Sequence, residues 1–156
     1  MSIKLPAAAI PIMLLLACTM LPGKASAGAA DAGQELAGAT ALRCVFKVAV
    51  ETVRAHGEYK NRPTNGFSYT IDDIVTARGN AKAVSPNGSS HLEMVALPNV
   101  RHFIGFTAGG DINLTTVQAQ FGRDETELLA VHSVHMASVP PKTFQHFGAC
   151  KPMAKK

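Results

Sequence analysis

Residues 101–119 read RHFIGFTAGGDINLTTVQA, and this stretch decides the fold. Two runs rich in β-branched and aromatic residues, 101–107 and 112–119, flank a Gly-Gly-Asp turn. From Ile112 to Val117 the side chains alternate so that the two faces of a strand can be separated. Gly110 and Asp111 between the runs predict a tight turn. The stretch therefore predicts a β-hairpin.

The same pattern continues on both sides of this hairpin. Turn signals rich in Gly, Pro and Asn recur about every 8–15 residues, a spacing typical of all-β domains. Further strand-like runs lie at 67–77, 91–97, 128–136 and 143–147. Short turns connect antiparallel strands, whereas parallel strands need long crossover segments. We expect an all-β fold: a single antiparallel meander of about seven or eight short strands that forms a small barrel or a sandwich.

The first foldable segment is ambiguous between a strand and a helix. Residues 44–53 are rich in Val and Phe, and as a strand they place Phe46, Val48 and Val50 on the face of Cys44. Residues 29–55 could instead extend as an Ala-rich helix. We favour the strand for 44–53 and allow a short helix before it.

Residues 1–27 have the parts of an export signal. Lys4 precedes the apolar run 7–17, and Ala25-Ser26-Ala27 forms a small-x-small cleavage site before Gly28. A retained membrane anchor is the alternative, but a spanning helix needs about 20 apolar residues. A lipid-bearing terminus at Cys18 is a second alternative, which would anchor the chain to the membrane. We expect an exported chain, periplasmic or secreted, with no integral membrane span after cleavage.

Removal of the signal leaves two cysteines, Cys44 and Cys150. In an oxidising compartment two cysteines allow one intrachain bridge, although two buried free thiols are the alternative. The bridge would join the first and last strands. Closing a loop of about a hundred residues stabilises the fold by about 4–5 kcal/mol in the chain-entropy model.

The remaining chain suits a single domain. We expect a flexible lead-in at 28–42, an antiparallel β domain at 43–151 and a basic tail at 152–156. The pI near 9.1 suggests a nucleic-acid partner. However, the nine Lys and Arg between the two cysteines are balanced by nine Asp and Glu. Nucleic-acid binders concentrate basic residues on one face. We therefore expect no nucleic-acid partner.

Four histidines are candidate metal ligands. His132 and His135 are three residues apart, so they would share the face of a helix but lie on opposite faces of the expected strand. A zinc site would then need a bulge, or partners such as His102 or His146 from neighbouring strands. Exposed or hydrogen-bonded strand histidines are the simpler interpretation.

Motifs for covalent catalysis and phosphate binding are missing from the sequence. There is no Gly-x-Ser-x-Gly elbow, no free cysteine once the bridge forms and no phosphate-binding glycine loop. We therefore assign no catalytic residue and no cofactor.

Three segments resemble a group of small exported bacterial proteins of unknown function. They are 113–117, 130–135 and 147–150, with weaker similarity at 43–46 and 69–72. The resemblance implies an all-β domain with terminal cysteines and brings no catalytic residues with it. In general design the expected domain is also similar to periplasmic inhibitors of lysozyme, although it lacks their tryptophan-bearing motif, and a shared fold does not establish a function.

These observations favour a non-enzymatic binding or inhibitor-type domain of the cell envelope, with an unknown protein or small ligand as its partner. The alternative is a histidine-based metal-binding protein or metal-dependent enzyme of the periplasm. A structural or stress-related envelope protein with a filled interior is the further alternative.

Overall fold

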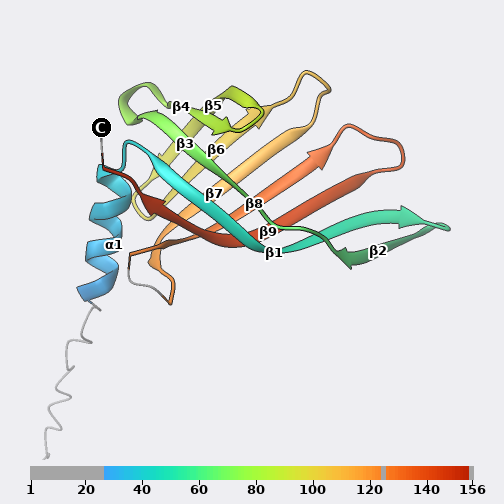
Figure 1. The fold of residues 1–156 in the computed structure, drawn as a ribbon, viewed down its shortest axis with the longest axis horizontal. Coiled ribbons are helices and arrows are strands. Elements are labelled where there is room, and N and C mark those ends of the chain that lie inside the picture. The colour runs from blue at the N-terminus through green and yellow to red at the C-terminus, as the bar shows by residue number, and fades with distance from the viewer. Residues whose placement is uncertain (1–26, 124–125, 155–156) are drawn as a thin grey trace, which may run out of the picture.

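The computed structural model describes residues 27–123 and 126–154, and the expected signal peptide, with Cys18, lies outside these described residues except for its last residue, Ala27. One helix precedes a continuous antiparallel sheet (Figure 1). The elements are α1 (Ala27–Gly38), β1 (Leu42–Ala55), β2 (Glu58–Pro63), β3 (Phe67–Val75), the 3-10 turn η1 (Thr76–Arg78), β4 (Asn80–Ser85), β5 (Gly88–Leu97), β6 (Val100–Phe106), β7 (Ile112–Phe121), β8 (Leu128–Met136) and β9 (Lys142–Pro152).

The sheet closes into a barrel. The strand order is β2-β1-β3-β4-β5-β6-β7-β8-β9, and β1 also pairs with β9. Eight strands form the closed barrel, while β2 pairs only with the second half of β1, so that the two project as a ribbon beyond the barrel (Figure 1). The predicted antiparallel meander is confirmed, and closure decides for the barrel against the sandwich. Closure also removes the exposed edges of an open sheet.

The Cys44–Cys150 bridge is confirmed. The two residues lie directly opposite each other in the β1–β9 ladder, and their sulfurs are 2.03 Å apart. The bridge therefore joins the strands at the seam of the barrel, as the sequence predicted. A disulfide fits a protein of an oxidising, non-cytoplasmic compartment.

The predicted face of β1 is correct only as far as Phe46. A bulge at Lys47 shifts the register between Phe46 and Val48. Phe46 pairs with Gly148 and Val48 with Phe147, so Lys47 is an extra residue on β1 without a partner on β9. Beyond the bulge Ala49 and Glu51 face the barrel side, and Val48 is 62% exposed. The prediction that Val48 and Val50 share the face of Cys44 is therefore wrong.

The expected flexible lead-in is instead a packed helix. Ala32 and Leu36 of α1 are 0% and 2% exposed and belong to the same apolar core as Leu42 and Phe103. A helix with a buried apolar stripe is stabilised mainly by such packing. No helix in the described part of the chain has the length and apolarity needed to cross a membrane.

Arg101 of β6 fixes the end of α1 to the barrel. Its guanidinium donates to the carbonyl oxygens of Ala39 and Ala37 at 2.9 and 2.7 Å, and to Thr76 Oγ1 at 3.3 Å. These carbonyls lie at and just beyond the helix C-terminus, where backbone acceptors lack intrahelical partners and a cation is favourable. Burial lowers the pKa of Arg101. The α1 end of the barrel is thus closed by a helix and a buried cation.

Two strands were absent from the sequence prediction. All six residues of β2 are exposed, and its sequence Glu-Tyr-Lys-Asn-Arg-Pro has no alternation of apolar and polar residues that would mark a buried face. β4 is a six-residue strand between two turn signals, and it is recognisable as a strand only through its pairing with β3 and β5.

Candidate ligand-binding site

The barrel contains a cavity of about 630 Å³. Such a volume is within the usual range of small-molecule sites. The cavity lies in the half of the barrel away from α1, and its lining comes from β3 to β8 and from two of their turns. The lining residues are Phe67, Ser68, Tyr69, Ala83, Ser85, Pro86, Asn87, Ser90, Leu92, Phe103, Gly105, Phe106, Thr107, Ala108, Asn113, Thr115 and His132.

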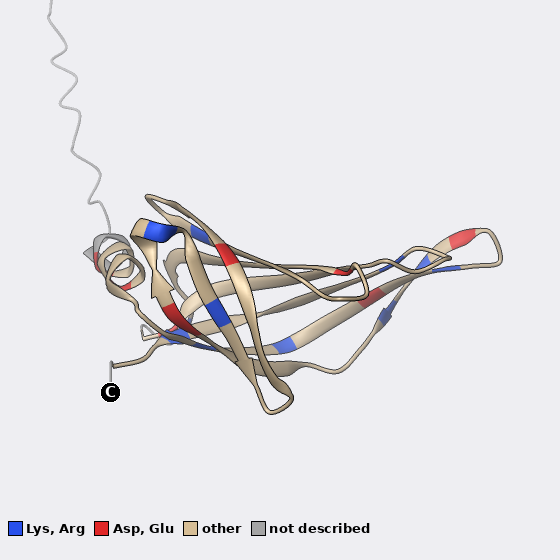
Figure 2. Ribbon diagram, turned by 90° about the horizontal axis from the view of Figure 1, so that it is seen from above, with Lys and Arg blue, Asp and Glu red and all other residues tan. Residues whose placement is uncertain are grey.

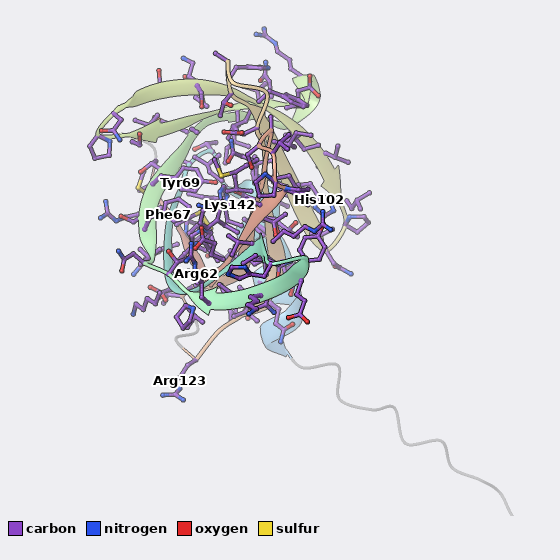
Figure 3. The ribbon with its side chains drawn as sticks, turned by 90° about the vertical axis from the view of Figure 1, so that its right-hand side faces the viewer. Arg62, Phe67, Tyr69, His102, Arg123 and Lys142 are labelled. Atoms are coloured by element: carbon purple, nitrogen blue, oxygen red, sulfur yellow. A yellow bond between two sulfur atoms is a disulfide. The ribbon has the colours of Figure 1, made fainter. Side chains whose placement is uncertain are left out.

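The mouth of the cavity carries both polar and apolar side chains, and its middle is apolar. The polar residues at the mouth are Ser85 at the end of β4, Asn87 in the following turn and Thr107 after β6. The apolar residues at the mouth are Pro86, Phe106 and Ala108. Below this rim lie apolar side chains, of which Leu92 and Phe103 are buried. Figure 3 looks along the barrel from the end opposite α1 and shows Phe67 and Tyr69 within the ring of strands. A ligand would therefore enter between the two turns and pass an apolar wall.

A chain of three hydrogen-bonded side chains crosses the interior at the buried end of the cavity. The hydroxyl of Tyr69 on β3 lies 2.5 Å from Thr115 Oγ1 on β7, and this Oγ1 lies 2.7 Å from Nδ1 of His132 on β8. Strands β3 and β7 are not neighbours in the sheet, so these hydrogen bonds connect opposite parts of the barrel wall across the interior. Thr115 and His132 are only 2% and 7% exposed. Tyr69, Thr115 and His132 therefore form a fixed polar group, the polar point, at the buried end of the cavity, beyond its apolar wall.

Tyr69 and His132, the two titratable side chains of this hydrogen-bonded group, are uncharged at neutral pH. Burial raises the pKa of Tyr69 to about 12 and outweighs the opposing effect of its hydrogen bond to Thr115. Burial, together with the charge of His146, lowers the pKa of His132 to about 4. A buried ionisable group takes its neutral form when no opposite charge compensates for lost hydration.

Aromatic rings pack around the imidazole of His132. Phe67 stacks on Phe46 and Tyr69 with centroid distances of 5.2 and 5.8 Å. The Phe67 ring meets His132 and His146 in edge-on geometry at 5.1 and 4.8 Å. These contacts exclude water from both imidazoles and hold Phe67 in the cavity wall.

Of the four candidate metal ligands, the structure brings together His132 and His146. They are directly opposite on β8 and β9, their centroids are 5.8 Å apart, and burial also lowers the pKa of His146. Nδ1 of His146 is buried and has no hydrogen-bond partner among the described residues.

The other two candidates lie elsewhere. His135 is exposed, and His102 Nδ1 lies 3.0 Å from Thr116 Oγ1 at the side of the barrel (Figure 3). Within the described residues no group of three or more His, Cys, Asp or Glu side chains is placed to hold a metal ion.

A separate ion cluster lies where β1 continues beyond the barrel. The buried carboxylate of Glu51 accepts from Arg62 of β2 and from Lys142 of β9. Hydrogen bonds from these two cations, Arg62 first, lower the pKa of Glu51. The carboxylate therefore joins three strands at the base of the projecting ribbon, and it is not part of the cavity lining.

Sequence reasoning did not identify the cavity or its polar chain. Tyr69 and Thr115 are 46 residues apart and meet only because the barrel closes. The alternation in 69–72 and 112–117 predicted strands but not which side chains face each other across the barrel. Arg101 lies in a strand as expected, but its position among β-branched and aromatic residues is also a signal of a buried cation.

The fold and the site define a closed antiparallel β-barrel with a hollow, uncharged interior at one end. A scan against protein-family models, a search of curated proteins and a search of solved structures each found no match to this chain. Functional inference therefore depends on the site itself.

Proposed function

We propose that this chain is an exported, non-enzymatic binding protein that holds a small ligand in the barrel. The observation that carries the proposal is the cavity of about 630 Å³, which has polar and apolar side chains at its mouth, an apolar wall and three hydrogen-bonded side chains at its buried end. A few fixed polar groups in a mostly apolar pocket are typical of small-molecule sites.

The division of the barrel into two halves supports binding over a purely structural role. Near α1 the interior is filled by buried side chains that include Leu42, Ile71 and Val117. The cavity occupies the other half, although interiors usually pack with few voids larger than a water molecule. A filled interior was the expectation for a structural envelope protein, and the hollow half favours a ligand.

The proposal of export rests on the signal-like residues 1–27 and on the disulfide. A small ligand is favoured over a protein partner because the cavity lies inside the barrel, where a folded partner cannot reach. The projecting ribbon of β1 and β2 is outside this cavity and has no part in the proposal.

The test fills the cavity with one large side chain. Ala83 lines the cavity, whereas its neighbour Val84 is exposed on the outer face of the same strand. We expect the neutral dye N-phenyl-1-naphthylamine to bind the wild-type protein and Val84→Trp with a saturable rise in fluorescence. Binding to Ala83→Trp should weaken roughly tenfold or more because the indole occupies the ligand volume.

The two Trp variants are matched controls for folding. The chain contains no tryptophan, so the emission of the introduced indole reports its own environment. Ala83→Trp should emit as a buried indole and Val84→Trp as an exposed one, with equal β-sheet circular dichroism. Equal dye affinity in all three proteins, or no saturable binding to the wild type, would overturn the binding function.

A further inference from the structure

We infer that the cavity selects an uncharged ligand: a compact, largely apolar molecule that carries one hydroxyl, arylamine or carbonyl group for the buried end. This inference rests on the proposed binding function and adds the chemical class of the ligand. Three observations support it: the composition of the lining, the order of polar and apolar side chains along the cavity, and the absence of Lys, Arg, Asp and Glu from the described lining residues.

Among the described residues that line the cavity there is no Lys, Arg, Asp or Glu. An ionised ligand would lose its hydration there without meeting an opposite charge, which carries a large free-energy penalty. Binding sites for anions instead provide Arg, Lys or a helix N-terminus. Figure 2 shows that Lys and Arg are scattered along the ribbon and intermixed with Asp and Glu. A fatty-acid anion, a nucleotide or a metal ion would therefore fit poorly.

The two titratable lining residues do not supply the missing charge. Tyr69 stays protonated and His132 stays neutral at pH 7, since burial moves the pKa of each away from neutrality. The titratable group that packs against His132 from β9 is His146, and burial lowers its pKa as well. On β1 and β9 the charged side chains Glu51 and Lys142 pair with each other, and neither lines the cavity.

The polar point at the buried end explains why the ligand needs a polar group. Thr115 shares its hydroxyl between Tyr69 and His132, and each of these side chains can exchange one hydrogen bond with a neutral donor or acceptor. Buried polar groups of this kind favour a ligand with a polar group, because a purely apolar ligand leaves the remaining hydrogen-bonding capacity of Tyr69 and His132 unused. Leu92 and Phe103 between this point and the rim contact the apolar body of the ligand.

A pair of dyes tests the selection by charge. N-phenyl-1-naphthylamine and 1-anilinonaphthalene-8-sulfonate share one aromatic framework and one amine, and they differ in a sulfonate. At pH 7 we expect the neutral dye to bind roughly tenfold more tightly, or more, in the part of the signal that Ala83→Trp abolishes. Only this part counts, because sulfonate dyes also bind exposed apolar surface.

A charge placed in the lining should reverse the preference. Ser90 lines the cavity and is exposed at its mouth, and the adjacent Ser89 is exposed but is not part of the lining. Ser90→Lys should tighten binding of the sulfonate dye, and Ser89→Lys should leave both affinities at the wild-type values. If both variants come to prefer the sulfonate dye, long-range attraction and not the cavity sets the preference between the dyes, and the inference is overturned.

The outcomes separate this inference from the proposed function. If the wild-type cavity binds the sulfonate dye as tightly as the neutral one, and Ala83→Trp abolishes both, the barrel is a binding protein but not one selective for neutral ligands. If Ala83→Trp changes neither dye, the proposed function itself fails.

Discussion

Single residues decide how polar the interior of this barrel can be. Tyr69, Thr115 and His132 satisfy one another by hydrogen bonds, so a polar group can lie beside Phe46 and Phe67 without a charge. The imidazole is the sensitive member of this group, because protonation would place an uncompensated charge against aromatic rings.

The stability of the protein should therefore fall in mild acid. The pKa of His132 is lowered from 6.5 to about 4, so the unfolded chain takes up a proton before the folded one does. The stabilising effect of the neutral imidazole is complete above about pH 6.5 and is lost as the pH falls towards 4, to a total of about 3 kcal/mol. Burial lowers the pKa of His146 too, which acts in the same direction.

Urea unfolding of the wild type and of His132→Gln, at about pH 7.5 and about pH 4.5, measures this effect. Glutamine keeps a hydrogen-bonding group near Thr115 and does not titrate. The variant should lose less stability than the wild type between the two pH values. Equal losses would contradict the assignment of the acid sensitivity to His132.

At the scale of elements, two polar contacts hold parts that the apolar core alone does not fix. Arg101 attaches the end of α1 to the barrel, and Glu51 attaches β2 and the beginning of β9 to β1. In both cases the partner residues come from different elements, so loss of one side chain should release an element and leave the barrel closed.

Replacement of Arg101 should release α1. Arg101→Met keeps the aliphatic volume but leaves the carbonyl oxygens of Ala37 and Ala39 without their donor. We expect a loss of about 2–4 kcal/mol in the free energy of unfolding, since hydrogen bonds from a charged donor contribute about 1.5–3 kcal/mol each and some burial cost is relieved. Urea unfolding measures it, with the exposed Arg78→Met as the control. An unfolding free energy equal to that of the control would show that α1 does not depend on Arg101.

Replacement of Glu51 should loosen the projecting ribbon. Glu51→Gln removes the charge shared by Arg62 and Lys142, so amide hydrogen exchange should become faster in β2 and in the first residues of β9. Exchange in β5 and β6, which do not contact the cluster, serves as the internal control. Faster exchange throughout the barrel would indicate a global change, and unchanged exchange in β2 would mean that backbone pairing alone holds the ribbon.

At the scale of the whole molecule, stability depends on joining the two ends of the chain. β1 pairs with β9 along the length of the seam, and the Cys44–Cys150 bridge crosses it at a sequence separation of 106. Non-local pairing of this kind forms only after a large loss of chain entropy, which the bridge reduces in the unfolded state.

Removal of the bridge should destabilise the protein strongly. Cys44→Ala with Cys150→Ala should reduce the free energy of unfolding by about 4–5 kcal/mol in the chain-entropy model. Urea unfolding measures the change, and the wild type in reducing buffer provides the matched comparison without a substitution. A loss below about 1 kcal/mol would show that the β1–β9 ladder closes the barrel without covalent help.

Much of the barrel could be predicted because its signals are local. β5, β6 and β8 lie where runs of β-branched and aromatic residues stand between turn signals. The prediction failed where a signal depends on the partner strand: β2 has no buried residue, and the bulge at Lys47 reverses which side chains of β1 face inward. The sequence allowed a short helix before β1 but not its packing, because the short apolar stripe with Ala32 and Leu36 is buried only against the barrel.

The sequence by itself determined an antiparallel all-β meander and the pairing of Cys44 with Cys150. Alternation and turn residues are properties of neighbouring residues, and only two of the three cysteines lie beyond the expected signal peptide. Only the tertiary structure decided that the barrel is closed, that α1 covers one end and that a cavity remains at the other. Tyr69, Thr115 and His132 come from three strands, and their contact depends on closure, curvature and register, which no short stretch of sequence encodes.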